Sequence, residues 1–234
     1  MKSKYLYLWI NILSFAIPFL CSFYRKANFS EKWKYVLPSI AVSAFIFLVW
    51  DAVFTALGVW GFNPRYVLDL TVAGLPIEEM LFFICIPYAC LFTYFALNHL
   101  IEKDHLFPHQ ELINSFLIIV LLIVGLYNMD KAYTATTFLA TGLFLSFVFL
   151  KLRMRFMGRF YFAFVVLLVP FLIVNGILTG LFTDEPVVWY NDNENLGIRL
   201  GTIPLEDVVY GMLALLVPIT IWEKLEEHMY YKTR

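Results

Sequence analysis

Seven apolar runs, each near the length of a membrane-crossing segment, alternate with short polar stretches along this chain. They lie roughly at residues 5–24, 36–61, 74–98, 112–128, 133–150, 160–182 and 203–222. Charged residues, Pro, Gly and Asn fill the connections between them. A helix needs about 20 mainly apolar residues to cross the hydrocarbon core of a bilayer. The pattern therefore predicts an all-α integral membrane protein with about seven transmembrane helices.

The composition supports this interpretation and excludes several other classes of protein. Of the 234 residues, 61% are hydrophobic and 15% are charged, and the mean hydropathy is +0.75. Soluble domains are roughly half apolar and a quarter charged. Cys21, Cys85 and Cys90 all lie in apolar runs, which predicts neither a disulfide framework nor a metal cluster. A large soluble domain does not fit in the remaining residues, and nucleic acid is not expected as a partner.

The distribution of positive charge predicts how the chain lies across the membrane. If all seven runs cross, five Lys and Arg residues fall on one side and twelve on the other. The five are Lys2, Lys4, Arg65, Lys131 and Arg199, and the twelve are Arg25, Lys26, Lys32, Lys34, Lys103, Lys151, Arg153, Arg155, Arg159, Lys224, Lys232 and Arg234. Because cytoplasmic loops carry the excess of positive charge, the N-terminus is predicted outside and the C-terminus in the cytoplasm.

Two motifs recur in the same order in the two halves of the chain. Asp51–Leu57 and Asn175–Leu181 both read Asp or Asn, small, apolar, apolar, Thr, small, Leu. Each is followed by a Pro-x-acid-acid motif that opens the next apolar run, Pro76-Ile77-Glu78-Glu79 and Pro204-Leu205-Glu206-Asp207. Such recurrence indicates an internal repeat.

The repeat predicts a domain organisation for the whole chain. Residues 1–100 form a first repeat of three helices, residues 101–130 a connector with the fourth helix, and residues 131–234 a second repeat of three helices. The connecting helix restores the direction of the second copy, so the two repeats are predicted to be parallel. Both acidic motifs then face the outer side of the membrane, where one shared polar site becomes possible.

The acidic residues of these motifs are the candidate catalytic groups. Proline and carboxylates also suit the first turn of any helix, so either motif alone has a structural explanation. Its repetition, and Asp51 inside an apolar run, favour a functional role because an intramembrane carboxylate is costly. Successive helical residues point about 100° apart, so one acid of each pair is expected to act. Glu78 and Glu206 are the first candidates, with Glu79 and Asp207 as supporting groups or helix caps.

Other side chains near these acids are candidates for contact with the substrate. Asn175 stands where the first repeat has Asp51 and cannot exchange a proton, so it is expected to orient a partner. Trp50, Phe54, Phe82 and Tyr210 belong to a dense set of aromatic residues around the acids. Most such rings belong to the core or to the interfacial belt, but those facing the site can stabilise a carbocation.

With these motifs, the chain resembles a known family. The resemblance is to the carotenoid cyclases that occur as two small membrane subunits in some actinobacteria, and fused in fungal bifunctional phytoene synthases. It rests on the two Pro-x-Glu-(Glu/Asp) motifs at residues 76–79 and 204–207, is extended by Asp51 and Asn175, and covers nearly the whole chain.

This resemblance implies lycopene β-cyclase activity, an isomerisation in the bacterial cytoplasmic membrane that closes the linear ends of lycopene into β-ionone rings. It leaves open whether one end or both ends are cyclised. Such acid–base chemistry needs no metal, flavin or nicotinamide cofactor in principle. The implied partners are a lipid-soluble carotenoid and the bilayer, and other carotenoid-pathway enzymes are further candidates.

Two other functions also fit part of the pattern. A proton-coupled transporter has parallel repeats and intramembrane acids, but the acids here cluster toward one end of the helices. A membrane prenyltransferase needs Asp-rich motifs to hold magnesium diphosphate, and neither Asp51 nor Asp207 has an Asp partner at helical spacing.

Overall fold

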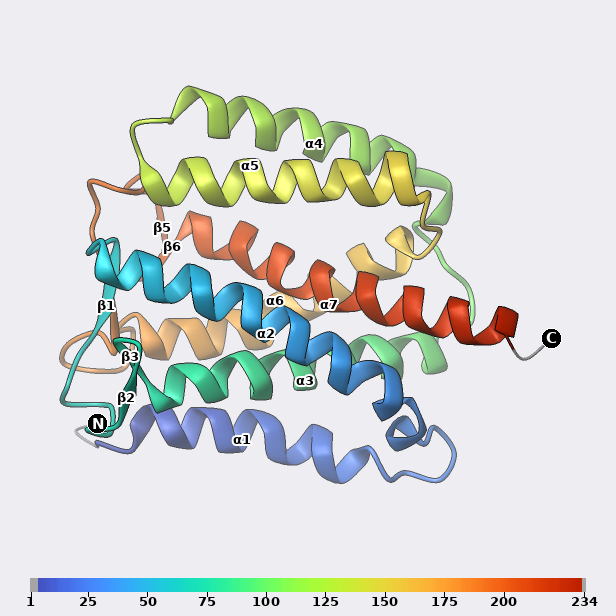
Figure 1. Ribbon diagram of the computed structural model, residues 1–234, viewed down its shortest axis with the longest axis horizontal. Coiled ribbons are helices and arrows are strands. Elements are labelled where there is room, and N and C mark those ends of the chain that lie inside the picture. Colours follow the sequence, from blue (N-terminus) through green and yellow to red (C-terminus); the bar gives the residue numbers. More distant parts are fainter. Residues whose placement is uncertain (1–3, 233–234) are drawn as a thin grey trace. The chain divides into compact units, whose positions relative to one another are not determined.

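The computed structural model describes residues 4–232, and this part of the chain is mainly helical (Figure 1). Seven α-helices follow one another: α1 Leu6–Cys21, α2 Trp33–Ala56, α3 Ile77–Leu100, α4 Gln110–Tyr127, α5 Ala132–Ser146, α6 Met157–Leu178 and α7 Leu205–Lys232. Short 3-10 turns precede α2 (Phe29–Lys32) and α4 (Phe107–His109), and a π-helix, Phe147–Leu152, extends α5. Lys2 and Arg234, which the charge count includes, lie outside the described residues.

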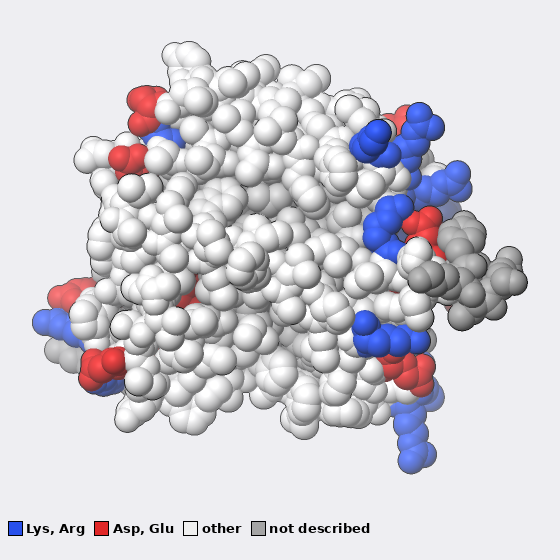
Figure 2. Space-filling view, in the orientation of Figure 1, with Lys and Arg blue, Asp and Glu red and all other residues white. Residues whose placement is uncertain are grey.

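Within residues 4–232, six of the helical segments are long and apolar enough to cross a membrane. They are Phe29–Ala56, Ile77–Leu100, Phe107–Tyr127, Ala132–Leu152, Met157–Leu178 and Leu205–Met229. The shorter α1 is also apolar but has 16 residues, about 24 Å at the α-helical rise. On the face shown in Figure 2, nearly all Lys, Arg, Asp and Glu side chains gather where helices end, and uncharged side chains cover the rest. The prediction of an all-α integral membrane protein is confirmed.

Short strands stand where the sequence predicted the ends of helices. β1, Trp60–Phe62, lies within the predicted span 36–61, because α2 ends at Ala56 and Gly58 adopts a left-handed φ of +71°. In the same way, α6 ends at Leu178, before the predicted end of its span at residue 182. By contrast, α7 continues to Lys232, past the predicted end of its span at residue 222. Its polar end is stabilised by hydrogen bonds such as the one from Trp222 to Glu226 at 2.8 Å.

The same order of elements occurs twice in the described chain. In the first repeat α1 and α2 are followed by β1, a hairpin of β2 (Thr71–Val72) and β3 (Leu75–Pro76), and α3. In the second, α5 and α6 are followed by β4 (Val188–Tyr190), a hairpin of β5 (Arg199–Leu200) and β6 (Ile203–Pro204), and α7. The helix α4 connects them, so the internal repeat predicted from the motifs is present in the structure.

The chain divides into two compact units that do not coincide with the repeats. The unit that we call the α1–α3 unit comprises Lys2–Ala56, Pro64–Leu100 and Ala214–Arg234. The other, the α4–α6 unit, holds Leu57–Asn63 and Ile101–Leu213, so it contains β1 and the start of α7.

In the α1–α3 unit, α1 and α2 both pack against α3. Its core includes the fully buried side chains of Tyr7, Phe47 and Leu91. At one end of this unit, Lys32 forms an ion pair with Glu226. The beginning of α2 and the C-terminal part of α7 therefore lie at the same end of the helices.

In the α4–α6 unit, α4 and α5 lie against each other over much of their length. Glycines make this approach possible, as is common between membrane helices. A Cβ at Gly125 of α4 would lie 2.7 Å from Cγ of Leu139, and one at Gly142 of α5 would lie 3.0 Å from Cδ2 of Leu122. Larger residues at either position would separate the two helices.

Candidate active site

The first acidic motif lies where a tight hairpin meets the start of α3. Pro76 ends β3, and Ile77 begins the helix. Ala73 and Gly74 form the turn of the hairpin with positive φ values of 53° and 84°. The N–H of Ile77 donates to the carbonyl of Leu70 at 3.0 Å. The chain before the helix is thereby folded back over its first turn, which removes the acids from water.

Glu78 is held through both its side chain and its backbone carbonyl, and its relative exposure is 0%. The N–H of Leu68 donates to Oε1 at 2.7 Å, and the Asn11 side chain of α1 donates to the Glu78 carbonyl at 2.8 Å. Among the described residues, the second carboxyl oxygen, Oε2, has no hydrogen-bond partner. One carboxyl oxygen of Glu78 is therefore anchored by the backbone, and the other is not.

Glu79 is bound by a tyrosine from the first helix of the repeat. The hydroxyl of Tyr7 donates to Oε2 of Glu79, and both side chains are buried. The ring of Tyr7 also lies 6.0 Å from the ring of Phe82, between centroids. Glu79 is thus in direct contact with an aromatic residue of α1, and the ring of that residue adjoins a ring of α3.

The second acidic motif repeats this construction in the α4–α6 unit. Glu206, with 0% relative exposure, accepts a hydrogen bond at Oε1 from the N–H of Leu196 at 2.7 Å. The hydroxyl of Thr134 donates to the same oxygen at 2.6 Å. Oε2 again lacks a hydrogen-bond partner within residues 4–232. In both motifs the anchoring N–H comes from the residue ten positions before the acid.

Asp207 accepts hydrogen bonds from three side chains of different elements. The hydroxyls of Tyr133 in α5 and Tyr190 in β4 donate at 2.5 and 3.0 Å, and the amide of Asn175 in α6 donates at 3.5 Å. The two oxygens of a carboxylate offer several acceptor positions, so Asp207 can accept all three hydrogen bonds. Tyr133 occupies the place in the second repeat that Tyr7 occupies in the first.

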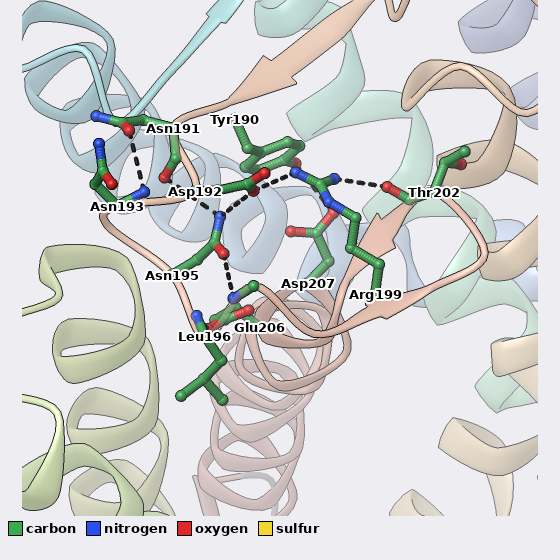
Figure 3. A network of polar contacts seen from close by, with 11 residues as sticks. Tyr190, Asn191, Asp192, Asn193, Asn195, Leu196, Arg199, Thr202, Glu206 and Asp207 are labelled. Atoms are coloured by element: carbon green, nitrogen blue, oxygen red, sulfur yellow. Dashed lines mark hydrogen bonds and ion pairs between the residues drawn. The ribbon is translucent and has the colours of Figure 1, made fainter.

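A polar loop before the second hairpin fixes the backbone that holds Glu206 (Figure 3). Asn195 is buried, donates to Asp192 at 3.1 Å and accepts from the N–H of Gly197 at 2.7 Å. Arg199 donates to Asp192 at 2.5 Å and to the carbonyl of Thr202 at 2.7 Å. The hydrogen bond from Asn195, together with the guanidinium of Arg199, holds the pKa of the Asp192 carboxyl below its ordinary value. These contacts position the N–H of Leu196 on the acid.

The remaining predicted residues are distributed between the two units. Asp51 is buried in α2, and the aromatic residues predicted to contact substrate in the α1–α3 unit form a connected row. Centroid distances of 5.8 to 6.2 Å link Tyr7, Phe82, Phe83, Phe47, Trp50 and Phe54 in that order. In the α4–α6 unit, the ring of Tyr210 lies 6.4 Å from that of Tyr133. Each acid pair is therefore accompanied by aromatic rings.

Sequence reasoning missed the groups that bind the acids from the first helix of each repeat. Tyr7 and Tyr133 stand 72 and 74 residues before their acidic partners. The repeat contained a usable signal, because both tyrosines occur at the start of the helix that opens the repeat. The donors Asn11 and Thr134 and the two anchoring N–H groups were also missed.

Comparison with known proteins is consistent with this arrangement. The model of the family described as lycopene cyclase matches residues 4–97 and 130–225, which include both acidic motifs and all the hydrogen-bond donors described above. No curated protein and no solved structure matches the chain significantly. The two matched segments span far more than half of the sequence. The chain therefore belongs to the lycopene cyclase family, an enzyme family of carotenoid cyclisation.

Proposed function

We propose that this protein is a lycopene β-cyclase, an isomerase that converts the linear ends of lycopene into β-ionone rings. The substrate is a lipid-soluble polyene, and the enzyme receives it from the bilayer in which its helices lie. γ-Carotene and β-carotene are the proposed products. The family match supports carotenoid cyclisation in general, and the acid pairs support this particular reaction.

One observation carries the proposal. Glu78 and Glu206 are fully buried, and each has Oε1 fixed by a backbone N–H while Oε2 has no hydrogen-bond partner among the described residues. A carboxyl group held in this way can act as a general acid toward a weak base such as an alkene. The fixed oxygen keeps the other one in a constant orientation, as general acid catalysis requires.

The proposed reaction combines two proton transfers with the closure of a ring. A carboxylic acid, Glu78 or Glu206, donates its proton to the terminal double bond, leaving a carboxylate and a tertiary carbocation. The internal double bond attacks this cation, forming the carbon–carbon bond of the ring and moving the positive charge into it. A carboxylate, for which Asp207 and Glu79 are the candidates, then removes a ring proton and leaves the β double bond. The substrate is neither oxidised nor reduced.

The other predicted site residues have supporting roles in this scheme. The rings of Trp50, Phe54, Phe82 and Tyr210 are proposed to contact the polyene and to stabilise positive charge through their π faces. Asn175 orients Asp207, to which it donates a hydrogen bond. Asp51 is a further candidate for proton exchange. The family match makes this scheme preferable to the proton-coupled transporter that the sequence alone left open.

The first test combines product analysis with the omission of redox cofactors. Protein purified into lipid vesicles is expected to convert lycopene into a product with a β-ionone ring without added flavin or nicotinamide, because no step oxidises or reduces the substrate. Chromatography and NMR of the pigment identify the ring. Expression in a lycopene-accumulating bacterium provides the matching measurement in cells. A ring with another double-bond position would contradict the β assignment, and an absolute requirement for reduced flavin would contradict the acid–base scheme.

A second test concerns orientation in the membrane. Reporter fusions after residues 29 and 155 are expected to report cytoplasm, and a fusion after residue 190 the outside, because positive charge marks the cytoplasmic side. The ion pair between Lys32 and Glu226 supports placing the α1–α2 connection and the C-terminal end of α7 on one side. A cytoplasmic signal at residue 190 would contradict the prediction that both acid pairs face the outer side.

A further inference from the structure

A strand from the first repeat pairs with the strand whose tyrosine donates a hydrogen bond to the second acid pair. β1 pairs with β4 in antiparallel register, with Trp60 opposite Tyr190 and Gly61 opposite Trp189. The pairing is close, because a Cβ at Gly61 would lie 2.3 Å from Cζ2 of Trp189. Two backbone hydrogen bonds extend the pairing beyond the strands. The N–H of Asn63 donates to the carbonyl of Val187 at 2.8 Å, and the N–H of Asn191 donates to the carbonyl of Val59 at 2.9 Å. The backbone of β1 is therefore fixed on that of β4.

This pairing brings Trp60 into a cluster of tyrosines next to Asp207. The Trp60 ring is buried, and its centroid lies 5.1 Å from that of Tyr133, 6.2 Å from Tyr190 and 6.3 Å from Tyr210. Tyr133 and Tyr190 stack on each other at 5.8 Å with an interplanar angle of 17°. These four rings form what we call the Asp207 aromatic cluster, and two of them donate hydrogen bonds to Asp207.

The position of Trp60 is not explained by the internal repeat. The hydrogen bonds between the two strands make Trp60 equivalent to Val188 and Phe62 equivalent to Tyr190. The second repeat thus has valine where the first has this tryptophan. A ring at position 60 is specifically matched to the tyrosines of the second acid pair, since edge-to-face aromatic contacts are favourable and directional.

We propose that Trp60 is a positioning residue for the second acid pair, although it belongs to the first repeat. Its ring contacts Tyr133 edge to face and also adjoins Tyr190, and thereby keeps both hydroxyls on the Asp207 carboxylate. Loss of the ring frees the tyrosines to adopt other rotamers, so the carboxylate that receives the ring proton moves away from its working orientation. This inference rests on the proposed function, because the effect is measured on cyclisation.

The test compares three replacements of Trp60 in the full-length protein in lipid vesicles. Trp60→Leu is expected to lower kcat about ten- to a hundredfold with a small change in KM, because small misplacements of reacting groups have effects of that size. Trp60→Phe keeps a ring and is expected to recover most of the activity. Trp60→Met also removes the ring but fills the space with a flexible apolar side chain. It replaces the leucine variant in this test if the leucine variant does not accumulate. Phe62→Val removes a ring from the same strand and is the matched control, expected to keep kcat within about twofold of wild type.

A double-mutant cycle separates positioning from a general effect on folding. In a background with Tyr133→Phe and Tyr190→Phe, the Trp60→Leu change is expected to cause no further loss of kcat, because the hydroxyls through which it acts are absent. Additive losses, or a Trp60→Leu variant with wild-type kcat per molecule, would overturn the proposal. These outcomes are independent of the proposed β product, because kcat is measured on whichever cyclic carotenoid the wild-type enzyme forms. Absence of any cyclic product from wild type would contradict the function itself.

Discussion

Replacing Glu78 or Glu206 by glutamine is expected to lower the rate of cyclisation by about a hundredfold to ten-thousandfold in at least one of the two variants, the usual contribution of general acid catalysis. Glutamine has nearly the same size as glutamic acid, and its carbonyl oxygen can still accept the hydrogen bond that Leu68 or Leu196 donates. It lacks the acidic proton that an alkene requires. The helix start should therefore survive the change while the chemistry does not.

The structure supplies a matched control for this experiment. Glu111 is the second residue of α4, as Glu78 is of α3 and Glu206 of α7, but its side chain is exposed. Glu111→Gln removes a carboxylate from the same helical position and is expected to leave the rate per molecule unchanged. Rates are measured in vesicles with the amount of inserted protein determined separately, since a helix-capping role predicts less protein with near-normal activity per molecule.

Cyclisation in deuterated water gives the complementary measurement. A proton that comes from a carboxyl group in exchange with solvent is expected to place one deuterium in each new ring, which mass spectrometry detects. If both glutamine variants cyclise at the wild-type rate per molecule, the catalytic proton comes from another group. Asp51, buried in α2, is then the next acid to replace.

The positions of the acids were predictable because they follow from local chemistry and from repetition. A carboxylate in an apolar helix is costly, so Asp51 and the paired acids stand out in the sequence without any structure. The helices were predictable because each is an apolar run long enough to cross a membrane. The repeat was predictable because the motifs recur in the same order, and each Pro-x-acid-acid motif opens a new helix in the structure.

The partners of the acids could not be predicted, because they depend on contacts between distant residues. A tyrosine such as Tyr7 in an apolar run is equally typical of a helix core, and its acidic partner is 72 residues away. β1 has only three residues, all compatible with the end of an apolar helix, and its pairing with β4 is non-local. Three residues are too few to show a strand periodicity, so the predicted span ran through Trp60.

Replacing Asp207 by asparagine is expected to lower the rate of cyclisation by about a hundredfold or more, the scale of general base catalysis. Asp207 lies where hydroxyls of Tyr133 and Tyr190 and the amide of Asn175 converge, so its carboxylate is held in a fixed orientation. Asparagine has nearly the same shape, but it cannot remove a proton from the cyclised cation and carries no charge to stabilise it.

Two further variants distinguish loss of the base from loss of structure. Asp207→Glu keeps a carboxylate, and the first repeat has Glu79 at this position, so this variant is expected to retain much more activity than the asparagine variant. Asp130→Asn makes the same change at an exposed residue of the α4–α5 turn and is expected to have no effect. The measurement is kcat in vesicles, corrected for inserted protein. If the asparagine variant works within about threefold of wild type while Asp207→Glu is impaired, the shape of the side chain matters more than its charge, and the base must be sought at Glu79, where Tyr7 donates the equivalent hydrogen bond.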